Sequence, residues 1–232
     1  PDANVQSIWS DMLDGLRYLR EWKGALILIG MALLFKLALT PAFSLVSLLV
    51  SDHFGGGAAQ YGLVESVSGV GIVAGGLILS AWGGFDRKIL TNLMGLIGIG
   101  VSMAVVGFTP AGAFWLAVGA FFFVGFLIPM VDGPIMAIMQ SAVKPEYQGR
   151  VFTLIGSLLS LSSPIGLALA GPLSDVFGLQ IWFVTAGVLT SAVGVAGLLV
   201  PAVMQIEENA NGGAETTEEQ TPAEVETLAP VA

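Results

Sequence analysis

The sequence has no cysteine and a single histidine, His53, among its 232 residues. These absences exclude a disulfide framework, a thiolate metal site, a cysteine nucleophile and a histidine cluster, so we expect no metal and no cofactor. Charged residues are also scarce, at 11% of the chain, whereas soluble domains carry about 25%. Together with a mean hydropathy of +0.85, this shortage of charge excludes an ordinary soluble domain.

Basic residues are the scarcer of the two charged classes, with eight Lys and Arg against seventeen Asp and Glu. Seven of the acidic residues come after residue 206, in a stretch rich in Glu, Thr, Ala and Pro that holds no base. Because such a composition cannot bury a core, residues 201–232 are expected to form a disordered acidic tail. The rest of the chain is nearly neutral and has no basic patch, which excludes nucleic acid as a partner.

Six long apolar runs fill the middle of the chain. Each is long enough to cross a bilayer as a helix, because about 20 residues at 1.5 Å each cover the hydrocarbon core. They predict an all-α integral membrane protein with a six-helix bundle over residues 24–200. Residues 1–23 read as an amphipathic helix on the cytoplasmic membrane surface, with a solvated linker helix as the alternative. The expected spans are residues 24–50, 60–82, 89–108, 114–139, 151–170 and 180–200.

All Lys and Arg residues outside the spans fall on one side of the membrane in this arrangement. The positive-inside rule makes that side cytoplasmic, so both termini of this multi-pass protein are expected there. The three loops on the other side contain no Lys or Arg. The cytoplasmic bases are Arg17, Arg20, Lys23, Arg87, Lys88, Lys144 and Arg150.

Four prolines lie inside the expected spans, at Pro41, Pro129, Pro134 and Pro164. A proline removes a backbone donor and bends a helix, so we expect kinks at these positions. Small residues also recur at a spacing of four, which lets membrane helices approach closely. The pairs are Gly71 with Gly75, Gly98 with Ser102 and Ala192 with Ala196, and either tight packing or gating hinges would use them.

Four phrases resemble a known family: residues 9–19 (WSDMLDGLRYL), 60–66 (QYGLVES), 82–85 (WGGF) and 140–152 with its QGRVF core. They are similar to the C-terminal half of a major facilitator superfamily transporter, in the drug-antiporter branch of macrolide-efflux and enterobactin exporters. The resemblance implies helices seven to twelve of a twelve-helix fold, arranged as a 3+3 inverted repeat. It also implies a partner, an N-terminal six-helix half absent from this chain. The family's loop signature is degenerate here, around residues 76–88.

Two charged residues lie deep inside spans. Lys36 is about 18 Å and Asp132 about 12 Å from the cytoplasmic side at 1.5 Å per residue. Intramembrane charges normally face a cavity or each other, and the resemblance makes the first and fourth helices neighbours. Lys36 and Asp132 are therefore candidates for a substrate or proton pathway, with a static pair, or Asp132 as a helix cap, as the alternative. Glu65 is a third candidate, or else an interfacial carboxylate.

Charged residues in the cytoplasmic loops form a second candidate group. We expect them to act as a gate or latch that links helices in one conformation, while solvated charges that only fix topology are the alternative. These residues are Asp86, Arg87, Lys88, Glu146 and Arg150.

The resemblance implies a secondary transporter that exports small amphipathic molecules across the cell membrane by alternating access, with proton coupling. An enzyme is not expected, because the single histidine and the scattered acids form no catalytic constellation at matching depth. The alternative function is a non-transporting half-protein or split subunit that needs a partner six-helix half.

Overall fold

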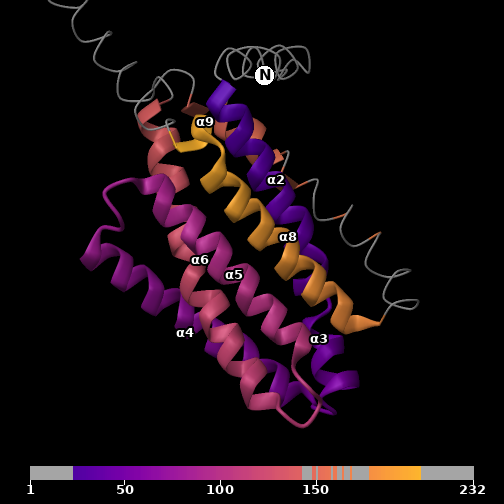
Figure 1. The fold of residues 1–232 in the computed structure, drawn as a ribbon. Coiled ribbons are helices and arrows are strands. Elements are labelled where there is room, and N and C mark those ends of the chain that lie inside the picture. The colour runs from indigo at the N-terminus through magenta and orange to yellow at the C-terminus, as the bar shows by residue number, and fades with distance from the viewer. Residues whose placement is uncertain are drawn as a thin grey trace, which may run out of the picture.

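The computed structural model is a bundle of long helices that run side by side (Figure 1). It describes residues 23–142, 148–149, 151–157, 159–160, 164, 168 and 178–204. The helix expected at residues 1–23 therefore lies outside the described residues, except for Lys23. The tail beyond residue 204 also lies outside them. The described helices are α2 (Lys23–Ser44), α3 (Val46–Leu48), the π-helix η1 (Leu49–His53), α4 (Ala58–Trp82), α5 (Lys88–Phe108), α6 (Phe114–Ala142), α8 (Leu179–Leu199) and α9 (Pro201–Met204).

Five helices in the described part of the chain are long and apolar enough to cross a membrane. In lipid every backbone N–H and C=O must be paired within the segment, which is why apolar runs of this length become helices. They match the first four expected spans and the last one. The run at 151–170 is described only in part, with residues 151–157 helical, so a sixth membrane helix stays a prediction. The five are Gly30–His53, Ala58–Trp82, Lys88–Phe108, Phe114–Ile138 and Leu179–Leu199.

Two boundaries differ from those expected. The first span does not end at Val50 but continues through η1 to His53, where the N–H of Phe54 still donates to the carbonyl of Leu49. Residues 201–204, expected as the start of the tail, form the short helix α9 instead and bury Val203 completely. Proline is well tolerated as the first residue of a helix, where no N–H donor is needed.

The central helix is α5, which packs against both α6 and α8. On the other side of α6 lies α4, and on the other side of α8 lies α2, so the order across the bundle is α4, α6, α5, α8, α2 (Figure 1). Although a short loop joins α4 and α5, they are not packing neighbours, because α6 lies between them.

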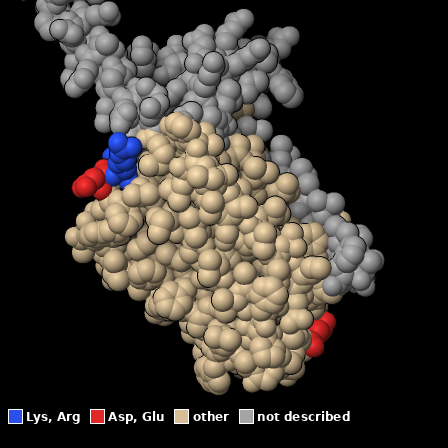
Figure 2. Space-filling view, in the orientation of Figure 1, with Lys and Arg blue, Asp and Glu red and all other residues tan. Residues whose placement is uncertain are grey.

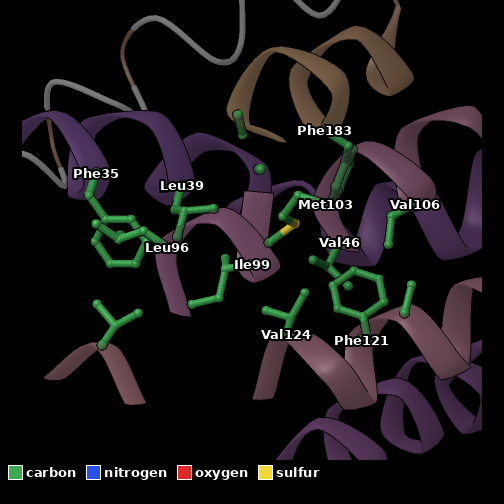
Figure 3. Close-up of a cluster of buried hydrophobic side chains, with 14 of the residues drawn as sticks. Phe35, Leu39, Val46, Leu96, Ile99, Met103, Val106, Phe121, Val124 and Phe183 are labelled. Carbon is green, nitrogen blue, oxygen red and sulfur yellow. The ribbon is translucent and has the colours of Figure 1, made fainter. Parts of the chain in front are cut away.

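The core gathers around one face of α5, where apolar residues recur every three or four positions as a helix face requires. Side chains from α2, α3, α6 and α8 close over this face (Figure 3). From α5 come Leu96, Ile99, Met103 and Val106, and around them lie Phe35, Leu39, Val46, Phe121, Val124 and Phe183, all of them buried.

Glycines bring α4 and α6 into backbone contact. A Cβ atom added at Gly71 would touch the carbonyl oxygen of Phe122, and one at Gly75 would touch that of Phe126. Only hydrogen atoms fit at these two positions, so the close approach expected from the Gly71–Gly75 spacing is confirmed.

The contact between α5 and α8 uses glycine as well. A Cβ atom at Gly187 would lie 2.5 Å from the nitrogen of Ala104 and 2.6 Å from the oxygen of Gly100. The expectation that Ala192 and Ala196 form a close contact was wrong for the described residues, since both are exposed. The spacing identified a small-residue stripe on α8 but not the face that packs.

The side of the bundle in Figure 2 is almost bare of charge between its two ends. The Lys, Arg, Asp and Glu side chains in view lie near those ends, where a membrane protein meets water. This distribution agrees with helices that cross the bilayer along their long axes.

Candidate functional site

Residues of α2 and α6 together line two adjoining cavities, with volumes of about 240 and 340 Å³. Four residues line both of them, namely Phe35 and Lys36 from α2 and Val131 and Asp132 from α6. The structure thus brings Lys36 and Asp132, about a hundred positions apart in the sequence, to one site.

The first cavity is mostly apolar, and α5 and residues 152–159 contribute to it as well as α2 and α6. Its polar lining consists of one cation, one carboxylate and one amide: Lys36, Asp132 and Asn92. The apolar lining is Met31, Ala32, Phe35, Leu96, Val131, Ile135, Met136, Phe152, Ile155 and Leu159. An apolar pocket with a few convergent polar groups is the usual form of a small-molecule site.

The second cavity extends along α2 from Phe35 past Pro41. The hydroxyls of Thr40 and Ser44 face this region, but both are already committed. Thr40 Oγ1 donates to the carbonyl of Lys36 at 2.7 Å, and Ser44 Oγ donates to the carbonyl of Thr40 at 2.9 Å. The charged groups of Lys36 and Asp132 therefore dominate the polar chemistry of both cavities.

Lys36 and Asp132 line the same two cavities, so their opposite charges share one space. No direct ion pair joins them among the described residues, and both side chains are exposed toward the cavities. Two opposite charges that compensate each other without being locked together leave room for a third group between them. Intramembrane charges of this kind mark ion or substrate pathways by default.

Asn92 is the residue that sequence reasoning missed. It sits one turn into α5, is only 1% exposed, and its Nδ2 donates to the carbonyl oxygen of Val131 on α6 at 2.7 Å. A carbonyl oxygen has two lone pairs, so that of Val131 can accept this bond beside one from its own helix. An amide inside an otherwise apolar span was the signal in the sequence that could have identified Asn92.

The four prolines at which kinks are expected all lie at helical positions. The kinks themselves stay a prediction. Pro41 lies in α2, which ends shortly afterwards at Ser44 before the chain continues as α3 and η1. Pro129 and Pro134 lie in α6, which runs without interruption from Phe114 to Ala142. Pro164 is helical and exposed.

Glu65 is not part of this site. It is exposed on α4 and lines neither cavity, while α4 packs on the opposite side of α6 from α5. Its position in the sequence does not reveal which face of the helix its side chain occupies. Its role in a pathway stays a prediction.

The candidate latch is only partly described. Asp86 and Arg87 lie in the loop between α4 and α5, and Lys88 is the first residue of α5, all three being exposed. Glu146 and Arg150 lie outside the described residues. Close to them in sequence, Gln148 Nε2 donates to the carbonyl of Gln140 at 2.9 Å, which ties the QGRVF phrase to the end of α6.

At the other end of the bundle, three segments meet at one carbonyl. The oxygen of Thr109, just after α5, accepts hydrogen bonds from His53 Nε2 at 2.9 Å and from Gln180 Nε2 at 3.3 Å. Although His53 is the last residue of a membrane span, it is half-buried and hydrogen-bonded. The chain thereby fastens the ends of the first, third and last described spans to one another.

A profile of the Major Facilitator Superfamily matches residues 25–229. The chain belongs to this superfamily. The resemblance expected from the four sequence phrases is thus confirmed, and the family indicates a multi-pass membrane transporter rather than an enzyme.

Several relatives of the chain are named as efflux proteins. Macrolide efflux protein A of Streptococcus pyogenes is 29% identical over 197 residues, which are 85% of this chain and 49% of that protein. Its namesake in Enterococcus faecalis is 32% identical over 157 residues, 68% of this chain and 49% of that protein. Multidrug efflux pump Tap of Mycolicibacterium fortuitum is 28% identical over 215 residues, 89% of this chain and 50% of that protein. The chain spans about half the length of these curated relatives.

Proposed function

We propose that the chain is the C-terminal half, helices seven to twelve, of a secondary transporter that exports small amphipathic molecules across the cell membrane. The observation that supports this most directly is the Lys36–Asp132 pair on two adjoining, otherwise apolar cavities. Apolar walls suit an amphipathic molecule, and a separable charge pair gives the protein two states that a bound group can bias.

In this proposal Lys36 neutralises Asp132 when the cavities are empty. A proton or a polar group of the substrate that reaches Asp132 releases Lys36, and the two halves of the transporter then rock about the site. A ligand changes the conformation only by binding one state better than the other, and the charge pair supplies that difference.

In the proposed topology the chain crosses the membrane six times, and both termini lie in the cytoplasm. The partner is an N-terminal six-helix half, in keeping with relatives about twice the length of this chain. Asp86, Arg87, Lys88, Glu146 and Arg150 then lie on the cytoplasmic side, where they latch the closed arrangement.

The test is export by cells that produce the chain together with an N-terminal six-helix half, measured as accumulation of a radiolabelled macrolide and of ethidium. Lys36→Ala and Asp132→Asn are each expected to slow export about tenfold or more, the factor that corresponds to about 1.4 kcal/mol of lost differential binding. Each removes one charge of the pair and leaves the other uncompensated in the membrane.

Matched controls are Leu37→Ala and Asp52→Asn. Leu37 neighbours Lys36 on α2 but lines neither cavity, and Asp52 is an exposed carboxylate at the far end of the first span. Both controls should export at the normal rate. Normal export by the Lys36 and Asp132 variants would show that the pair has no part in transport.

A further inference from the structure

Asn92 leaves one atom of its amide without a partner, although it is among the most buried polar residues in the described part of the chain. The side chain is 1% exposed, and its Oδ1 has no hydrogen-bond partner among the described residues. A buried acceptor without a donor costs about 1–3 kcal/mol, so a native protein seldom keeps one without a use.

The identity of the unpaired atom follows from the other end of the amide. Nδ2 lies 2.7 Å from the carbonyl oxygen of Val131, which can only accept. Turning the amide over would place two acceptor oxygens against each other, so the nitrogen must face Val131 and the oxygen must remain free. The hydrogen bond therefore fixes Oδ1, an acceptor, as the unpaired atom of Asn92.

The surroundings of this acceptor are those of a binding site. Asn92 lines the 240 Å³ cavity together with Lys36 and Asp132. The neighbouring residue on α6, Val131, holds the amide in place, while apolar side chains make up the rest of the wall. A fixed acceptor beside a carboxylate and a cation distinguishes ligands by the donors they carry.

We propose that Asn92 determines which molecules this cavity binds, by accepting a hydrogen bond through Oδ1 from an N–H or O–H group of the ligand. The preferred ligand is a small, largely apolar molecule that places such a donor next to Asp132. The proposal rests on the proposed function only where it gives this cavity a role in transport. The binding preference itself needs only the residues of this chain.

A site that hydrogen-bonds a ligand donor discriminates strongly against an analogue without it, because the acceptor is then buried unpaired. Proflavine and acridine orange form a suitable pair of fluorescent probes. Both are tricyclic monocations, but proflavine carries two NH₂ groups where acridine orange carries two dimethylamino groups. Their charges act alike on Lys36 and Asp132, so a difference between them reports on N–H donors.

The experiment measures the fluorescence of each dye on titration with the chain in lipid nanodiscs, with empty nanodiscs as the blank. The unaltered chain is expected to prefer proflavine, and Asn92→Leu to lose about two- to tenfold of that preference, the factor for one hydrogen bond. Asn92→Ser, whose hydroxyl is shorter than the amide and lies nearer the backbone, should lose it too, so the test does not depend on the folding of one variant.

The matched control is Thr190→Val, which removes another buried, unpaired side-chain oxygen, on α8 and away from both cavities. It should leave the preference unchanged. If Asn92 only braces α6, its variants will weaken both dyes by the same factor, and that result overturns the proposal. An unaltered chain that binds the dyes equally, or binds neither, overturns it as well. Loss of export in the Lys36 and Asp132 variants is a separate readout, so the two proposals can fail independently.

Discussion

Replacing Gly75 by alanine tests whether glycine contacts set the distance between α4 and α6. The added Cβ would lie 2.8 Å from the carbonyl carbon of Phe126 and nearer still to its oxygen, whereas ordinary contacts begin at 3.4 Å. The helices must separate by about half an ångström or more, a gap that forfeits a quarter to a half of the dispersion energy of each contact. Overpacking of this kind costs about 1–3 kcal/mol.

The matched control is the next residue on the same helix. A Cβ at Gly76 would meet nothing within 4 Å, so Gly76→Ala gains the helix propensity of alanine, about 1 kcal/mol, without a clash. Since both variants make this gain, the difference between them isolates the cost of the clash.

The assay is unfolding of the purified chain by titration with SDS in mixed micelles, followed by circular dichroism. Gly75→Ala is expected to be about 1–3 kcal/mol less stable than Gly76→Ala. Equal stability of the two variants would refute the view that α4 and α6 touch through this glycine.

The remaining predictions concern topology and the far end of the bundle. Because the chain has no cysteine, Ala111→Cys and Phe85→Cys can each be labelled against no background. A membrane-impermeant maleimide added to intact cells should label Ala111→Cys only, and labelling of Phe85→Cys alone would reverse the proposed orientation. Gln180→Leu should lower the free energy of unfolding by about 1 kcal/mol through loss of its hydrogen bond to the Thr109 carbonyl. An unchanged SDS midpoint would show that this bond adds nothing to stability.

The membrane helices could be predicted closely because the bilayer fixes their length and forbids unpaired backbone groups between their ends. The start of α5 and the end of α4 follow from the charged, glycine-rich loop between them, and Gly83 ends α4 in the left-handed conformation at φ 81°. The end of the first span was placed three residues early, since the polar residues Ser51 and Asp52 suggested a loop. The bond from His53 to the distant Thr109 carbonyl, which no local pattern reveals, holds the extended end in place.

The candidate site was predictable as far as charge is concerned. Lys36 and Asp132 stand out because an ionised group in an apolar span needs a cavity or a partner. Asn92 and His53 did not stand out, because their partners lie 39 and 56 positions away in the sequence. Their roles come from helix packing, and the same packing directs Glu65 away from both cavities.

The order of helices across the bundle has a consequence for how the chain is made. The least buried of the five described membrane helices, α4, has its main packing partner in α6, which is synthesised after α5. Between the end of α4 at Trp82 and the end of α6 at Ala142 the ribosome adds about 60 residues, which takes about 3–12 s at 5–20 residues per second. During that interval α4 must stay in the bilayer without its partner, and its run of apolar residues keeps it there. Biogenesis therefore inserts the helices in one order and assembles them in another.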